Sequence, residues 1–277
     1  MDYESKFKTR DGLELYERGW APDEDVVGRV VFVHGYGEHC SRYEEMARVL
    51  NESGFSIHTY DQRGFGHSPG RRGEVGDFGA LVEDLDAFVA YLRPRLEGKP
   101  WFLMGHSMGG LVLAHYAETR EVEAGGLVFS SPFLAMDAPA VLLKVSGVLA
   151  ALMPWMPVAQ VEYEGRSRDP EAVKEAREDP LIFAGPVRAR TGAEFNRAVN
   201  AARAGFSKIS LPVYIIHGGA DRIVPDVGSR MLYAQCSAAD KSLKIYDDGY
   251  HELWNDLEKA AVLSEVCEWL TAHAREE

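Results

Sequence analysis

A serine between glycines is the first feature of this 277-residue chain that could do chemistry. Residues 105–109 read Gly-His-Ser-Met-Gly, directly after an apolar run (101–104) and directly before a helical pattern that starts at Met108. A serine at a sharp strand-to-helix turn is held in a strained conformation with its hydroxyl exposed. The start of the helix supplies N–H groups where an oxyanion would form. In this context the pattern predicts Ser107 as a nucleophile, whereas alone it would indicate only a glycine-rich turn.

A nucleophilic serine needs a base, and the base needs an acid that orients it. On an architecture of this kind the expected chain order is serine, acid, histidine. The apolar run 213–217 leads through Gly-Gly-Ala to Asp221, and the run 243–246 leads to a loop that carries His251. Both residues follow a strand at its carboxyl end, where open α/β sheets place their ligands. We therefore expect His251 to be the base and Asp221 the acid.

Other residues compete for these two roles. Asp247 and Asp248 are nearer to His251 in sequence, but a separation of three or four residues is an awkward reach across a tight turn. Asp226 is expected to start a helix, and His217, at the end of a strand, is expected to be packed or to cap a neighbouring element.

The oxyanion needs a second N–H donor from a different loop. Residues 34–37, His-Gly-Tyr-Gly, follow the apolar run 28–33. The glycines allow the backbone to turn toward the serine, so the predicted donors are the N–H groups of Tyr36 and Met108. The alternative is a simple glycine turn.

The surrounding chain alternates between short apolar runs and helical patterns, which predicts a mostly parallel sheet with helices on both faces. A hairpin signal, Asp11-Gly12 between two alternating runs within 6–19, predicts that the sheet begins antiparallel. The expected strands are 28–33, 56–60, 101–104, 127–130, 213–217 and 243–246, and the expected helices are 41–50, a four-turn helix capped by Asp77, one from Met108, and 257–273.

The alternation stops between residues 132 and 210, where no convincing strand occurs. We expect residues 133–207 to form a helical cap inserted into a core made of residues 1–132 and 208–277. Within it, one side of a helix over 141–153 is apolar. Such a stripe most often packs into a core; the alternative is that part of it lines an acyl tunnel or touches a lipid surface. The stripe consists of Val141, Leu142, Val145, Val148, Leu149 and Leu152.

Composition excludes several classes of function. Lys and Arg total 30 against 43 Asp and Glu, a net charge of −13, which argues against nucleic acid as the main partner and against a polybasic lipid anchor. Cys40, Cys236 and Cys267 are widely spaced without a CxxC pair, so neither a zinc nor a redox motif is predicted. The charged N-terminus predicts no secretory signal, and we expect a cytoplasmic protein.

Five segments together resemble a known family: HGYGEH (34–39), DQRGFGHS (61–68), GHSMGG (105–110), HGGADRIVP (217–225) and DGYHE (248–252). They resemble the α/β-hydrolase fold, and within it the monoacylglycerol lipase and lysophospholipase-like family, over nearly the whole chain. The resemblance implies a Ser107–Asp221–His251 triad, oxyanion donors at Tyr36 and Met108, no metal or cofactor, and fatty-acid monoesters of glycerol as substrates.

The resemblance also bears on the polar end of the substrate site. In the family, Glu38 and Arg42 would lie near the glycerol. Some relatives carry a second histidine three residues after the catalytic one; this chain has Trp254 there, and we expect Trp254 to be a substrate-binding residue. Leu149 is the residue of the apolar stripe that we expect to contact the acyl chain.

The sequence therefore predicts a serine ester hydrolase that transfers an acyl group to water in two steps. The alternatives are a lysophospholipase, a broader carboxylesterase or an acyltransferase with the same triad, and, from another class, an inactive binding protein on this fold. Transient contact with a membrane surface through the cap is a further expectation.

Overall fold

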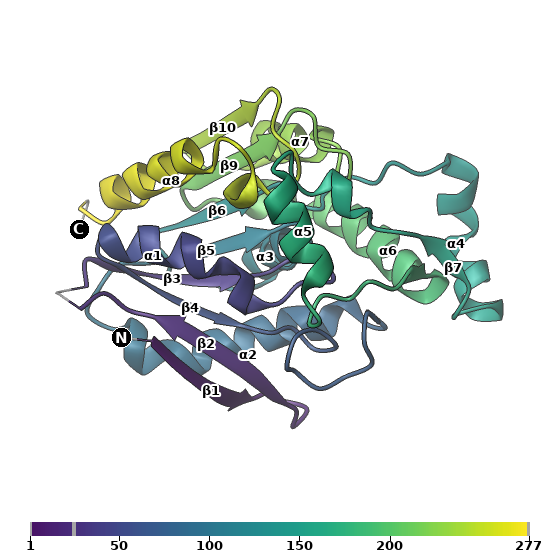
Figure 1. Ribbon diagram of the computed structural model, residues 1–277, viewed down its shortest axis with the longest axis horizontal. Coiled ribbons are helices and arrows are strands. Elements are labelled where there is room, and N and C mark those ends of the chain that lie inside the picture. Colours follow the sequence, from purple (N-terminus) through teal and green to yellow (C-terminus); the bar gives the residue numbers. More distant parts are fainter. Residues whose placement is uncertain (1, 24–25, 276–277) are drawn as a thin grey trace.

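The computed structural model describes residues 2–23 and 26–275, and an eight-stranded sheet organises them (Figure 1). Its strand order is β1-β2-β4-β3-β5-β6-β9-β10. The β1–β2 and β2–β4 pairs are antiparallel, and every other pair in this sheet is parallel. The prediction of a parallel sheet with an antiparallel start is therefore confirmed. The strands are β1 (Asp2–Lys8), β2 (Glu14–Trp20), β3 (Gly28–Val33), β4 (Phe55–Tyr60), β5 (Trp101–His106), β6 (Gly126–Ser130), β9 (Val213–Gly218) and β10 (Lys241–Tyr246).

The first hairpin turns at the predicted Asp11-Gly12. Gly12 adopts a φ of 92°, which a side chain would disfavour, and its N–H donates to the Thr9 carbonyl. The turn sets a register in which Phe7 faces Leu15, and both side chains are buried. The antiparallel start of the sheet thus follows from local turn chemistry.

Helices cover both faces of the sheet, as the alternation predicts. Strands β3, β4, β5, β6 and β9 are almost entirely buried because each is covered on both sides, which explains their unbroken apolar runs. One apolar core joins the sheet to α2 (Phe78–Leu96), α3 (Met108–Thr119) and α7 (Val227–Gln235). The other joins it to α1 (Glu44–Glu52) and α8 (Lys259–His273).

A capping side chain determines where one helix begins, and packing determines where another begins. Asp77 caps α2 as expected, since its carboxylate accepts the Gly79 N–H at 2.9 Å. The helix expected over 41–50 instead begins as a 3-10 turn (Cys40–Tyr43), and α1 follows at Glu44. The tighter turn brings Tyr43 and Cys40 into the core.

Between β6 and β9 the chain leaves the sheet, and we call residues 133–207 the inserted segment. It contains α4 (Ala140–Leu152), β7 (Pro157–Ala159), α5 (Pro170–Glu178), β8 (Val187–Arg188) and α6 (Ala189–Gly205). Figure 1 shows α4 and β7 projecting beyond the main sheet. The expectation of a segment without strands was wrong, because β7 and β8 pair antiparallel. These strands are only two or three residues long, too short to show a period in the sequence.

The apolar stripe of α4 is not a core face. Val141 is 73% exposed, Val148 62% and Leu152 76%, and no described side chain of α4 is buried. Leu142 has a side chain outside the described part of the structure. The interpretation of the stripe as ordinary core is therefore wrong, and the alternative of an exposed apolar surface agrees with the structure. In residues 2–23 and 26–275, no helix combines the length and the apolar character needed to cross a membrane.

Candidate active site

Ser107 lies in a strained turn between β5 and α3. Its φ is 53° and its ψ −118°, a conformation that non-glycine residues rarely adopt. The turn is held because the Ser107 N–H donates to the Ser130 carbonyl at 3.0 Å, and the Ser107 carbonyl accepts from Leu111 and Phe133. These bonds fix the backbone and leave the hydroxyl free to point out of the sheet.

Two glycines let other backbone segments approach this turn. A Cβ on Gly109 would lie 2.6 Å from the His34 carbonyl oxygen, so only glycine allows the start of α3 to rest against the end of β3. A Cβ on Gly35 would lie 3.1 Å from the Cβ of Ser107. The backbone that leads into Tyr36 therefore runs directly beside the serine.

Three side chains from distant parts of the chain form a hydrogen-bonded relay. The Ser107 hydroxyl lies 2.9 Å from Nε2 of His251, and Nδ1 of His251 lies 2.7 Å from a carboxylate oxygen of Asp221. The other Asp221 oxygen accepts the N–H groups of Ile223 and Val224 at 2.8 and 2.9 Å. Ser107 and Asp221 follow β5 and β9, and His251 lies beyond β10, so the parallel sheet brings all three to one edge.

The electrostatics of the relay favour an ionised acid and a basic imidazole. Burial raises the pKa of Asp221, but the charge of His251 and hydrogen bonds from His217 and His251 outweigh it and hold this pKa well below its usual range. Burial lowers the pKa of His251, and attraction to Asp221 outweighs it and raises this pKa above the ordinary value. His217 also bonds Ser229 at 2.8 Å, which matches its expected packing role.

The competing acids lie elsewhere. Asp247 and Asp248 are exposed on the turn after β10. Asp226 stands at the start of α7 and pairs with Arg230. Asp221 is the acid that bonds the imidazole.

The two predicted oxyanion donors flank the serine. Met108 is the first residue of α3, so its N–H has no acceptor one turn earlier. The Tyr36 side chain anchors its own loop, because its hydroxyl donates to the Gly73 carbonyl at 2.7 Å and its ring packs edge-on against Phe65. Both residues line the cavity described next.

A cavity of about 450 Å³ opens above Ser107 and His251. The core supplies its floor, and the inserted segment supplies most of its walls. Leu149 and Glu38, two of the predicted substrate-binding residues, are on its lining. Most of the wall is apolar; its apolar side chains include Phe133, Met136, Leu143, Val158, Val187 and Phe195.

The other two predicted substrate-binding residues lie behind this lining. Arg42 donates two hydrogen bonds, of 2.9 and 3.0 Å, to the carboxylate of Glu252. Trp254 is 2% exposed and packs edge-on against His106 and Phe32. Neither is among the described residues that line the cavity, so this geometry gives them no direct substrate contact.

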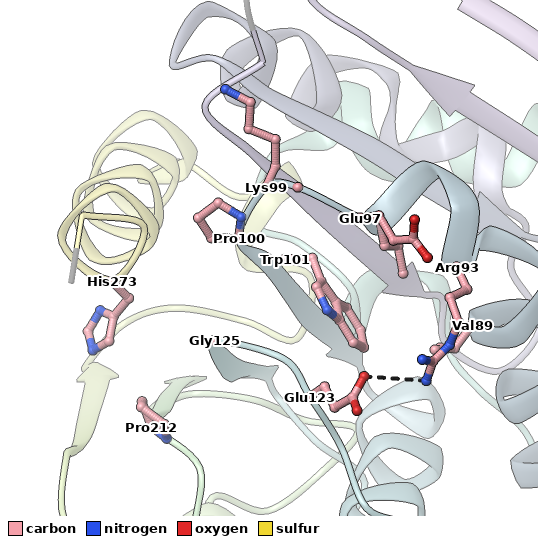
Figure 2. Close-up of a pocket in the computed structure, with 12 residues that line it drawn as sticks. Val89, Arg93, Glu97, Lys99, Pro100, Trp101, Glu123, Gly125, Pro212 and His273 are labelled. Carbon is pink, nitrogen blue, oxygen red and sulfur yellow. Dashed lines mark ion pairs between the residues drawn. The ribbon is translucent and has the colours of Figure 1, made fainter. Parts of the chain in front are cut away.

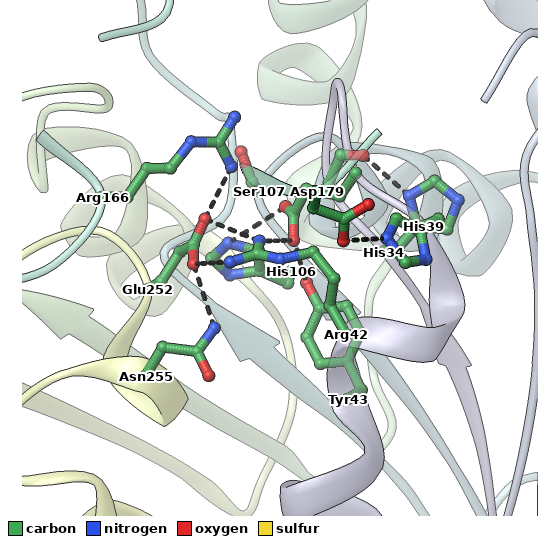
Figure 3. Close-up of polar contacts among 12 residues, drawn as sticks. His34, His39, Arg42, Tyr43, His106, Ser107, Arg166, Asp179, Glu252 and Asn255 are labelled. Atoms are coloured by element: carbon green, nitrogen blue, oxygen red, sulfur yellow. Dashed lines mark hydrogen bonds and ion pairs between the residues drawn. The ribbon is translucent and has the colours of Figure 1, made fainter. Parts of the chain in front are cut away.

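Sequence reasoning missed a group of buried charges at the polar end of the cavity (Figure 3). Glu252 and Arg166 are 1% and 4% exposed and pair at 2.7 Å, and Arg166 lines the cavity. Next to them, burial lowers the pKa of His106 to about 4, so this imidazole is neutral at ordinary pH. The available signal was a glutamate directly after the candidate base, in DGYHE.

A second hollow lies at the opposite end of the sheet (Figure 2). Trp101, Gly125 and Pro212, at the amino ends of β5, β6 and β9, line it, together with an Arg93–Glu123 ion pair of 3.3 Å. Open parallel sheets bind ligands at the carboxyl ends of their strands. The cavity beside Ser107 is therefore the candidate active site.

Comparison with known proteins agrees with this geometry. The family model described as serine aminopeptidase, S33, matches residues 24–258. The monoacylglycerol lipase of Mycolicibacterium smegmatis is 34% identical over 98% of this chain and 97% of its own length. The chain belongs to the monoacylglycerol lipase-like family of α/β-hydrolases.

Further members support this membership. The monoglyceride lipase of Homo sapiens is 32% identical over 94% of this chain and 88% of its own. The crystal structure of the Paleococcus ferrophilus monoacylglycerol lipase superposes with a TM-score of 0.83 at 33% identity, covering 94% of this chain and 99% of that one. The protein is thus an ester hydrolase, and its sheet and helices are those of the α/β-hydrolase fold.

Proposed function

We propose that this protein is a monoacylglycerol lipase, which hydrolyses the single ester bond of a fatty-acid monoester of glycerol. The observation that carries the proposal is the Ser107–His251–Asp221 relay at the floor of an apolar cavity with one polar end. The similarity of this chain to a monoacylglycerol lipase over nearly its full length supports the proposal.

In the first step, Ser107 attacks the ester carbonyl while Nε2 of His251 takes the hydroxyl proton. Asp221 holds the imidazole in the tautomer with its proton on Nδ1 and stabilises the imidazolium that forms. The N–H groups of Tyr36 and Met108 stabilise the tetrahedral oxyanion. The imidazolium then gives its proton to the departing glycerol oxygen, which leaves an acyl group on Ser107.

In the second step, water takes the place of glycerol. His251 removes a proton from the water as it attacks the acyl carbonyl. Collapse of the second tetrahedral intermediate breaks the bond to Ser107, returns the proton to the serine and releases the fatty acid. Ser107, His251, Asp221 and the two backbone N–H groups thus serve both steps, with water as the second acyl acceptor.

The polar end of the cavity favours a neutral leaving group. Glu38 and Arg166 line it, and behind them Arg42 and Glu252 complete a set of two carboxylates and two guanidinium groups that pair with one another. A phosphate-bearing leaving group would need surplus positive charge, which this set does not have. Glycerol, a neutral polyol, fits it better than the headgroup of a lysophospholipid.

The inserted segment, in this proposal, is the cap that encloses the acyl chain and meets the lipid. Leu143, Ser146 and Leu149 of α4 line the cavity, while Val141, Val148 and Leu152 are exposed. An exposed apolar stripe on a helix is typical of transient contact with a lipid surface. Vesicle sedimentation of the native protein and of a Val148→Ser, Leu152→Ser double variant tests this contact.

A substrate panel tests the function. We expect long-chain monoacylglycerols to be hydrolysed with a higher kcat/KM than diacylglycerols, triacylglycerols and lysophospholipids of the same acyl chain. A peptide p-nitroanilide with a free amino terminus should be inert. Faster hydrolysis of the lysophospholipid would favour the lysophospholipase alternative, and cleavage of short esters alone would favour a general carboxylesterase.

A further inference from the structure

Four charged side chains are buried together next to the candidate base, and Figure 3 labels three of them, Arg42, Arg166 and Glu252. One Glu252 oxygen accepts from Arg42 at 3.0 Å and from Arg166 at 2.7 Å, and the other accepts from Arg42 at 2.9 Å. Glu38 accepts from Arg42 at 3.0 Å and from the Tyr43 hydroxyl at 2.7 Å. We call Glu38, Arg42, Glu252 and Arg166 the charge cluster; its formal charge is zero.

The charge cluster joins three separate parts of the chain. Glu38 and Arg42 follow β3, Glu252 is the residue after His251, and Arg166 follows the 3-10 turn Tyr163–Gly165 of the inserted segment. Arg166 binds Glu252 twice, since its carbonyl also accepts the Glu252 N–H at 2.7 Å. The inserted segment is therefore bound directly to the residue beside the candidate base.

The position of the cluster connects it to His251. Glu252 is the next residue in the chain after His251, and Glu38 lies 3.7 Å from His106, whose ring centroid is 4.8 Å from that of His251. Buried charges act strongly over such distances because little water screens them. Burial raises the pKa of Glu252, but the positive charges of Arg42 and Arg166 outweigh this effect and hold the pKa well below its usual range.

We propose that Glu252 and Arg166 are positioning residues that act through His251, with the inserted segment supplying the cation that balances the carboxylates facing the base. This inference rests on the proposed Ser107–His251–Asp221 hydrolysis. In the native protein the guanidinium of Arg166 cancels negative charge near the imidazole. Docking of the inserted segment thereby sets how readily His251 gains a proton.

Other charged and titratable groups also face the imidazole of His251, and the substitutions at Arg166 and Glu252 leave these groups in place. Asp221 bonds the imidazole, His217 lies 3.3 Å from the same carboxylate oxygen, and the ring of neutral His106 lies tilted beside it. On the loop of His251, the Tyr250 ring lies under the guanidinium of Arg222, and the Tyr250 backbone N–H donates to Asp256.

The sign of the effect follows from charge alone. His251 accepts the serine proton only when neutral, so kcat/KM falls as pH drops through its pKa. Arg166→Gln leaves the cluster at −1, which stabilises the imidazolium and moves the acid limb of the pH profile to higher pH. Glu252→Gln leaves it at +1 and moves the limb to lower pH. A unit charge at this range corresponds to a shift of about 0.5–1.5 pH units.

The experiment records kcat/KM against pH for one water-soluble ester with the native protein, Arg166→Gln, Arg166→Lys and Glu252→Gln. Arg166→Lys keeps the charge and should keep the acid limb in place. The matched control is Arg177→Gln, which removes an exposed arginine of the same segment that pairs with exposed Glu164. Thermal melting checks that each variant folds.

The inference is supported if the acid limb of the pH profile moves in opposite directions for the two glutamine variants. It is overturned if the acid limb stays in place while kcat/KM falls equally at every pH, because that result indicates a purely structural role. If Glu252→Gln does not fold, Arg166→Gln decides alone: an upward shift supports the inference and an unmoved limb overturns it. A failure of the proposed function is distinguishable, since the native protein would then be inactive or Ser107→Ala would retain its activity.

Discussion

Replacing Leu149 by serine should reduce the hydrolysis of long-chain esters selectively. Leu149 is a half-buried side chain of α4 on the lining of the cavity, whereas its neighbour Val148 is 62% exposed. The two residues therefore form a matched pair on one helix, with one side chain facing the cavity and one facing solvent.

The magnitude follows from the apolar surface that is lost. Serine in place of leucine removes about three apolar carbons from the wall, and each buried methylene is worth about 0.8 kcal/mol. Since Leu149 is only half-buried, we expect a loss of about 1–1.5 kcal/mol in binding a long acyl chain, or about five- to twelve-fold in kcat/KM. An ester of two to four carbons does not reach this wall and should lose little.

The assay compares a long-chain monoacylglycerol with a short ester, together with the melting temperature. Because no described side chain of α4 is buried, Leu149→Ser should lower Tm by only about 2–4 °C. Val148→Ser is the control, and with the long-chain ester kept below its critical micelle concentration it should leave the hydrolysis of both esters unaffected, because no lipid surface is then present. An equal loss on both esters with a large fall in Tm would refute this reasoning, since it would mean that Leu149 supports the fold rather than the acyl chain.

Two further substitutions test the site. Asp221→Asn should disable turnover because the amide stabilises the wrong histidine tautomer, whereas Asp248→Asn, on an exposed turn, should do much less; steady-state kinetics with a soluble ester compares them, and the reverse order would make Asp248 the acid. Gly109→Ala should lower both Tm and activity, because a Cβ at that position would lie 2.6 Å from the His34 carbonyl oxygen; a variant with native Tm and kcat/KM would show that the close approach of α3 to β3 is unnecessary.

The sequence predicted the sheet and the relay because both depend on order along the chain. Alternating apolar runs and helices define a parallel sheet, and a parallel sheet brings the residues after its strands to one edge. The sequence alone therefore predicts that Ser107, Asp221 and His251 lie close together. The antiparallel start needed only the turn at Gly12.

The features that the sequence did not reveal depend on contacts between distant residues. The pairing of Arg166 with Glu252 spans 86 positions, and no local pattern marks it. The stripe on α4 has the period of a core helix, but its exposure depends on how far the inserted segment projects from the sheet. Trp254 was expected at the substrate because of its spacing from His251, yet the loop turns its ring back against His106.

The most direct test of the central claim is the hydrolysis of a long-chain monoacylglycerol by the native protein and by Ser107→Ala. The substitution removes one hydroxyl, so the variant should fold with an unchanged melting temperature. Without the nucleophile, turnover should fall by about three orders of magnitude or more. A folded variant that retains more than about a tenth of the native turnover would contradict the assignment of Ser107, since losing a nucleophile costs far more than that.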